Sequence, residues 1–199
     1  MTAASPGIVA SAMENRFYAT IEDYVRAVAA ALATEYRTIV DRGLLLQIDA
    51  PDLALERHTL FADRPLREFL GWVELVVDSI NSALEGVDPS MVRLHVCWGN
   101  YEGPHTHDVD FADIQPLLYE ARVGAIVLSM ANARHAHEHH CFERLPLPDH
   151  MSLVAGESSR PWKSRWREPS TRGWMGSPVK GGGPHVSESS SGTLEVVGH

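Results

Sequence analysis

Cysteine is scarce in this sequence, and long apolar runs and an excess of positive charge are missing. The 199 residues include two cysteines, Cys97 and Cys141, which excludes a disulfide-stapled secreted domain. No segment approaches the roughly 20 apolar residues of a membrane span, and the N-terminus lacks the basic and apolar regions of a signal peptide. A net charge of -9 argues against a chain-wide surface for nucleic acid or anionic membranes. We therefore expect a cytoplasmic protein of small-molecule chemistry, with no nucleic-acid or membrane partner.

The chain does contain enough apolar residues, 44%, to build one α/β domain. Helical spacing of apolar residues alternates with short apolar runs typical of buried strands. The expected helices cover 20–43, 65–86 and 111–122, a helical or irregular piece covers 133–142, and the expected strands cover 44–49, 91–98, 124–130 and 151–156. Residues 1–12 are expected to form a loop. The alternation predicts about four parallel βα units, which is half of a TIM-type (β/α)8 barrel.

The composition changes after residue 156, so we predict a domain over residues 1–156 and an irregular tail over 157–199. The tail is crowded with Ser, Gly and Pro and carries three of the five tryptophans without helical or strand periodicity. It could be a basic, aromatic segment that contacts nucleic acid, or an ordinary disordered tail. Our preferred hypothesis is translation of a GC-rich gene in the wrong reading frame, which resequencing would test.

One strand carries a candidate metal-ligand pair, His95 and Cys97. Residues i and i+2 of a strand point to the same face, so an imidazole and a thiol would lie side by side. These are the ligand types that zinc prefers. Gly99 and Pro104 follow and start a loop, so the pair lies at the carboxyl end of a strand, where α/β folds place their sites. The alternative is a buried cysteine beside a core histidine.

Other polar residues follow the strands, and each has a structural alternative. Asp49 could cap the turn at Pro51. His105 and Asp108 could hold a loop through bonds to the backbone. The run 135–140, which includes His135, His137 and Glu138, could form a separate metal site, but we expect a solvated, locally helical surface.

Three motifs in order resemble the cobalamin-independent methionine synthase superfamily. They are LQIDAPDLA at 46–54, HVCWGN at 95–100 with GPH at 103–105, and ANARHAHE at 131–138. The branch they resemble is the set of single-barrel proteins akin to the C-terminal domain of that enzyme and to epoxyalkane:coenzyme M transferase. The resemblance implies a TIM-type barrel in which zinc activates a substrate thiol, homocysteine or a coenzyme M-like thiol, to attack a methyl or alkyl donor.

The resemblance also assigns residues. His95 and Cys97 fall on the family's zinc pair, and Asp49 falls on an acidic residue that contacts the amino-acid substrate. We place Asn100 with Asp49 as substrate-binding and assign no catalytic residue. The remaining polar residues on loops of the same barrel end have no assigned role; they are His105, His107, Asp108, His135, His137 and Glu138.

The sequence departs from the family pattern in its zinc ligands and in its length. A further cysteine from the family's final strand region is not present, and the strand that carries a glutamate ligand in methionine synthase is Leu128–Met130 here. The first barrel strands are also missing. The leading hypothesis is a zinc-dependent thiol methyl- or alkyltransferase, and the alternative is a non-catalytic, truncated remnant that binds metal weakly or not at all. A zinc hydrolase is a third possibility. Unpaired sheet edges predict self-association or instability.

Overall fold

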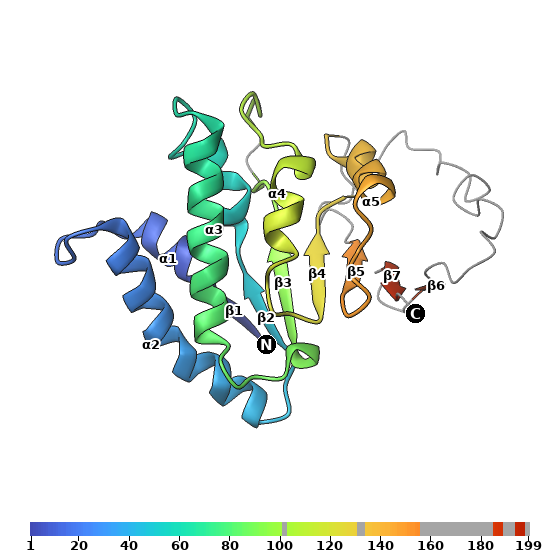
Figure 1. Ribbon diagram of the computed structural model, residues 1–199, viewed down its shortest axis with the longest axis horizontal. Helices are drawn as coiled ribbons and strands as arrows, with labels where there is room; N and C mark the ends of the chain where they lie inside the picture. Colours follow the sequence, from blue (N-terminus) through green and yellow to red (C-terminus); the bar gives the residue numbers. More distant parts are fainter. Residues whose placement is uncertain (101–102, 131–133, 156–184, 189–193, 198–199) are drawn as a thin grey trace.

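The computed structural model describes residues 1–100, 103–130, 134–155, 185–188 and 194–197. Its centre is a seven-stranded sheet in the order β1-β2-β3-β4-β5-β7-β6 (Figure 1). The first five strands are parallel: β1 (Thr2–Ala4), β2 (Leu46–Asp49), β3 (Val92–Val96), β4 (Ala125–Leu128) and β5 (Ser152–Ala155). Two short strands, β7 (Leu194–Val197) and β6 (His185–Glu188), continue the sheet in antiparallel fashion. The structure is therefore α/β, as predicted.

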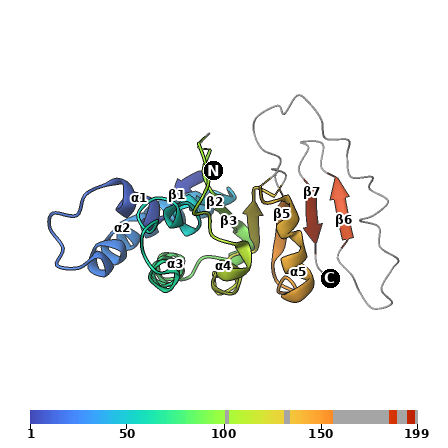
Figure 2. The ribbon, with the colours of Figure 1, turned by 90° about the horizontal axis from the view of Figure 1, so that it is seen from above.

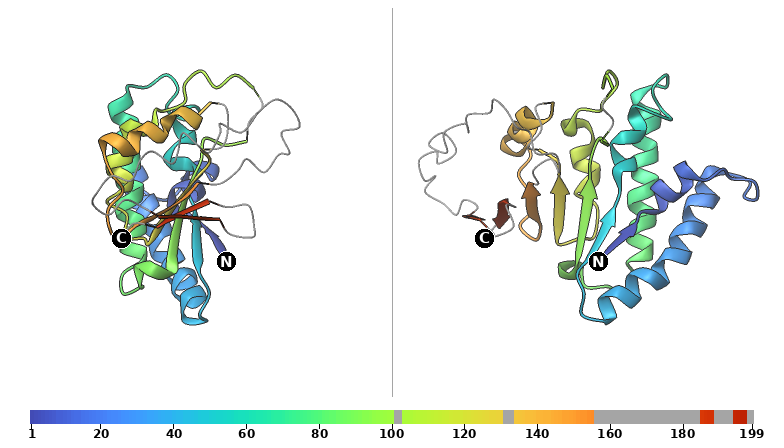
Figure 3. Two further views of the ribbon diagram at one scale, coloured as in Figure 1. Left: turned by 90° about the vertical axis from the view of Figure 1, so that its right-hand side faces the viewer. Right: turned by 180° about the vertical axis from the view of Figure 1, so that it is seen from behind.

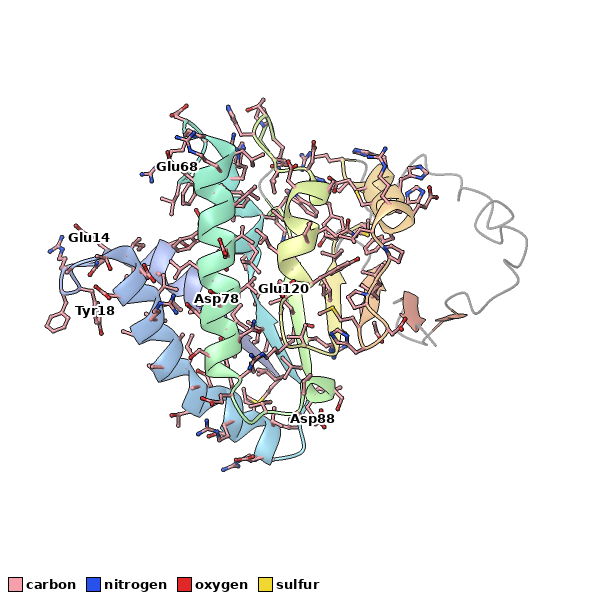
Figure 4. All side chains as sticks on the ribbon, in the orientation of Figure 1. Glu14, Tyr18, Glu68, Asp78, Asp88 and Glu120 are labelled. Atoms are coloured by element: carbon pink, nitrogen blue, oxygen red, sulfur yellow. The ribbon has the colours of Figure 1, made fainter. Side chains whose placement is uncertain are left out.

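The described residues form the helices α1 (Pro6–Ala12), α2 (Ile21–Asp41), α3 (Leu66–Ala83), α4 (Phe111–Leu118) and α5 (Cys141–Arg144). The two long helices, α2 and α3, form where the apolar spacing predicted them. The hydroxyl of Thr20 accepts the first-turn N–H of Asp23 and so caps α2. Gly43 follows α2 with a φ of 73°, a conformation that glycine adopts without steric cost. The exposed side of α3 carries the acidic residues Glu68 and Asp78 (Figure 4).

The longer helices cover one face of the parallel sheet. Figures 2 and 3 show α2, α3, α4 and α5 gathered on the same side of the strands. Along β3 the side chains of Val92, Leu94 and Val96 are fully buried against this layer, whereas Arg93 and His95, which alternate with them, are only partly buried. In the described part of the chain no helix covers the second face. We call it the open face of the sheet.

The expected loop at residues 1–12 is wrong, because these residues form β1 and α1. The strand was missed since Thr2, Ala3 and Ala4 are small and have no apolar alternation, yet they pair in register with β2 from Gln47 to Asp49. Ser5 lies in this expected loop, but its hydroxyl accepts the N–H of Ile8 and caps α1, with Pro6 at the first helical position. The sheet thus has five parallel strands where the sequence predicted four.

Shorter single-turn helices fill several connections, and the remaining expectations need smaller corrections. The 3-10 helices are η1 (Pro51–Leu53), η2 (Leu55–Arg57), η3 (Pro89–Met91) and η4 (Ala136–His140). The helix expected to reach residue 122 ends at Leu118, two residues after Pro116. Most of the tail lies outside the described residues, so the division at 156 and the interpretations of the tail stay predictions. Among the described residues, no helix has the length and apolarity needed to cross a membrane.

Candidate functional site

Asp49 and His95 lie next to each other at the carboxyl ends of β2 and β3. The parallel register pairs the two residues directly, which puts both side chains on the open face of the sheet. A carboxylate oxygen of Asp49, Oδ1, is hydrogen-bonded to Nδ1 of the His95 ring. The two side chains are 44% and 24% exposed, so the pair is reachable from solvent. The strand register therefore builds a carboxylate–imidazole pair at this edge of the sheet.

Cys97 joins this pair from the residue after the end of β3. Its side chain is partly buried, as are those of Arg93 and His95 at the alternate positions before it. The hydrogen bond between Cys97 and His95 is the main cause that raises the pKa of His95 to about 9, and the bond to Asp49 adds to it, while burial acts in the opposite direction. The predicted neighbourhood of His95 and Cys97 on one strand face is thus present, and the alternative of a cysteine packed into the core does not hold.

The donor set of this site fits part of a zinc site. An imidazole nitrogen and a sulfur side by side have the right chemistry, and Asp49 orients the ring as second-sphere carboxylates orient metal-bound histidines. A structural zinc site has four protein ligands, and a catalytic zinc site has three protein ligands together with water or substrate. Within the described residues, no group of three or more His, Cys, Asp and Glu side chains could hold a metal ion. Asn100 is exposed three residues beyond Cys97, and its substrate role stays a prediction.

A second polar cluster joins the loops that follow β3 and β4. Nδ1 of His105 lies 2.8 Å from Oδ2 of Asp108, and the same oxygen lies 3.1 Å from Nε2 of His135. Nδ1 of His135 lies 3.0 Å from Oε2 of Glu138, whose Oε1 accepts the N–H of Phe111 at 2.7 Å. We call the four residues His105, Asp108, His135 and Glu138 the loop network. It ends on the first residue of α4 and supplies that helix with a cap from another loop.

The loop network is buried, which corrects the expectation of a solvated surface. The side chains of His135 and Glu138 are 8% and 5% exposed, whereas His137 between them is exposed as predicted for the whole run. The ring of His135 also stacks on Trp98 at a centroid distance of 3.8 Å. The i,i+3 spacing of His135 and Glu138 could have indicated a shared helical face, but not the buried partner. His105 and Asp108 do hold a loop, and the contacts described for them are between side chains.

Sequence reasoning missed a buried acid, Asp52, in η1. It is fully buried, Oδ1 accepts the Ser5 hydroxyl at 2.5 Å, and Oδ2 has no hydrogen-bond partner in the described structure. Burial raises the pKa of Asp52 to about 7. Gly7 packs so closely that an added Cβ would lie 2.0 Å from Oδ2. The only sequence clue was the position of Asp52 inside the LQIDAPDLA motif.

Comparison with known proteins finds similarity to methionine synthases. A methionine synthase of Sulfolobus acidocaldarius is 29% identical over 133 residues, which are 66% of this chain and 32% of that protein. Methionine synthases of Saccharolobus islandicus and Saccharolobus solfataricus are 31% and 30% identical over 102 residues, which are 51% of this chain and 26% of each relative. No family model and no solved structure matches. The chain spans about a third or less of the length of these relatives, and the similarity supports a relationship at the level of the methionine synthase superfamily.

Proposed function

We propose that this chain contributes the zinc- and thiol-binding part of a methionine synthase-like enzyme, which transfers a methyl or alkyl group to a substrate thiol. One observation carries the proposal: His95 and Cys97 share the open face at the carboxyl end of the sheet, with Asp49 bonded to the ring. The names of the distant relatives support the same class of reaction. A five-stranded parallel sheet with helices on one face is compatible with part of a TIM-type barrel.

In this proposal His95 and Cys97 hold the zinc ion together with the substrate sulfur. Zinc supplies a positive charge that keeps the substrate thiol deprotonated, and the thiolate is the nucleophilic form. Asp49 holds Nδ1 of His95, which fixes the tautomer and the ring direction. Homocysteine and a coenzyme M-like thiol are the acceptors that we propose.

A measurement of bound zinc tests the proposal. After loading and dialysis, we expect the full chain to retain about one zinc ion per chain and the Cys97→Ala variant to lose it. Cys141→Ala is the matched control, since Cys141 lies on α5 away from the His95 pair and its loss should leave zinc content unchanged. Proton release on adding homocysteine or 2-mercaptoethanesulfonate to the zinc form then reports thiolate formation.

The second candidate is a non-catalytic remnant of such an enzyme. It is favoured by the donor set, because the described residues bring together two candidate zinc ligands, His95 and Cys97, and no group of three. In that case neither the wild-type chain nor Cys141→Ala retains zinc after dialysis. Zinc retention that is the same in wild type and Cys97→Ala would also contradict the proposed site.

A further inference from the structure

Arg93 is the one other ionised side chain of β3, and it shares the open face with His95 and Cys97. The alternation along β3 places it two residues before His95, and the register puts it between Gln47 on β2 and Ala125 on β4. Residues two apart in a strand are separated by roughly 7 Å, a distance that an extended arginine side chain can cover. The guanidinium can therefore reach the space in front of His95, and the small side chain of Ala125 does not block it.

Arg93 is also short of partners. Its side chain is half-buried, its Nε is buried without a hydrogen-bond partner, and in the described part of the chain it takes part in no ion pair. Other arginines differ: Arg26 on α2 is paired with Glu22 one helical turn away, at 3.0 Å. A buried donor without an acceptor is unfavourable, so the guanidinium gains from a side-chain conformation in which a bound anion accepts its N–H groups. The planar guanidinium matches carboxylate and sulfonate groups through two parallel hydrogen bonds.

We propose that Arg93 binds the anionic group of the substrate thiol, so that the site selects small anionic thiols over neutral ones. This inference rests on the proposed function for the identity of the substrate. Arg93 is a specificity-determining residue here: it holds the carboxylate or sulfonate while the sulfur end lies toward His95 and Cys97. The carboxyl group of Asp49 on the same face disfavours an anion at the His95 end and so favours this orientation.

The test compares two alkylating probes of Cys97 on the zinc-free full chain, iodoacetate and iodoacetamide. They share a leaving group and differ in charge, so the ratio of their rates at Cys97 cancels the intrinsic reactivity of the thiol. Mass spectrometry of the Cys97 peptide measures each rate separately from Cys141. We expect Arg93→Gln to lower the iodoacetate to iodoacetamide ratio by about 10-fold, the lower end of what a hydrogen bond to a charged group contributes. Arg93→Lys should keep most of the ratio.

Arg37→Gln is the matched control, because Arg37 is exposed on α2 in the helical layer. A ratio in Arg93→Gln equal to that of the wild type overturns the inference. If Arg93→Gln does not fold, the wild type still decides: ethanesulfonate, an anion without a thiol, must slow iodoacetate alkylation of Cys97 more than iodoacetamide alkylation. Equal slowing, or none, overturns the inference as well.

A calorimetric titration of the zinc form separates this inference from the proposed function. We expect 2-mercaptoethanesulfonate to bind more tightly than 2-mercaptoethanol and Arg93→Gln to remove about 10- to 100-fold of that preference. Zinc retained without any preference for the anionic thiol leaves the proposed function standing and overturns the role of Arg93. If the chain retains no zinc but the alkylation ratio still depends on Arg93, the proposed function is overturned and the role of Arg93 in binding anions stands.

Discussion

The open pair of Asp49 and His95 and the buried loop network use the same residue types in different surroundings. In both, a carboxylate holds Nδ1 of a histidine ring. Asp49 is 44% exposed and its histidine has a thiol as its second neighbour. In the loop network both nitrogens of His135 are taken by carboxylates, and one of those carboxylates caps α4.

The difference shows what each group can do. His135 has its two ring nitrogens satisfied inside the protein, so it can stabilise loops but offers no site to a ligand. His95 is held by Asp49 through Nδ1 and lies beside the partly exposed thiol of Cys97, an arrangement suited to a ligand or a metal ion. Trp98 connects the two regions, because it follows Cys97 and stacks on His135. Substitutions should therefore affect stability in the loop network and ligand binding in the open pair.

The largest effect should follow from His135→Ala. This change leaves the buried carboxylates of Asp108 and Glu138 facing each other without the ring between them, and breaking a buried pair costs about 3–5 kcal/mol of folding free energy. Chemical denaturation followed by circular dichroism measures the free energy of unfolding. His140→Ala is the control, because the His140 side chain is 61% exposed and its loss should change stability by less than about 0.5 kcal/mol. Equal stability of the two variants would contradict a structural role of the loop network.

Asp52 is a buried carboxyl group whose described partner is the Ser5 hydroxyl and not a histidine ring. Its pKa in the folded state is about 7, above the unfolded value of 3.8, so the folded chain binds the extra proton. Stability from this group is present below pH 4 and is lost as the pH rises toward 7. A shift of about three units corresponds to a loss on the order of 4 kcal/mol.

Asp52→Asn should remove this dependence, because an amide keeps an acceptor for the Ser5 hydroxyl and cannot ionise. We expect the variant to be more stable than the wild type at pH 8 and similar to it at pH 4. Urea denaturation at a series of pH values measures the difference. If the free energy of unfolding depends on pH in the same way in both proteins, the pKa of Asp52 is not raised by folding and the expectation is wrong.

Much of the helical layer could be predicted from the sequence because apolar periodicity and capping are local. Thr20 acts on the first turn of α2, the apolar stripe repeats every three to four residues, and Gly43 follows the last turn. The strand β1 could not be predicted in this way, since Ala3 and Ala4 become a strand only through pairing with Ile48 and Asp49, more than forty residues away. Its three small residues carry no periodicity of their own.

The candidate site also contains features that depend on local sequence and features that depend on long-range contacts. His95 and Cys97 were predictable, because their common face depends on strand geometry alone. The bond from Asp49 to His95 depends on the register between β2 and β3, and the loop network depends on two loops that meet only after the sheet has formed. Asp52 was hidden for a related reason, since its burial comes from the packing of α1 and Gly7 against η1.

The smallest expected effect, and the sharpest contrast with His135→Ala, belongs to Asp49→Asn. An exposed ion pair contributes about 0–1 kcal/mol, so the free energy of unfolding should hardly change. Zinc affinity should fall by about 10- to 100-fold, because loss of the carboxylate that orients a metal-bound histidine has this effect. Competition with a chromophoric chelator measures the affinity, and Asp63→Asn, an exposed loop residue, is the control. A variant that loses stability but keeps its zinc affinity would place Asp49 with the loop network, because its carboxylate would then support the fold and not the orientation of the His95 ring.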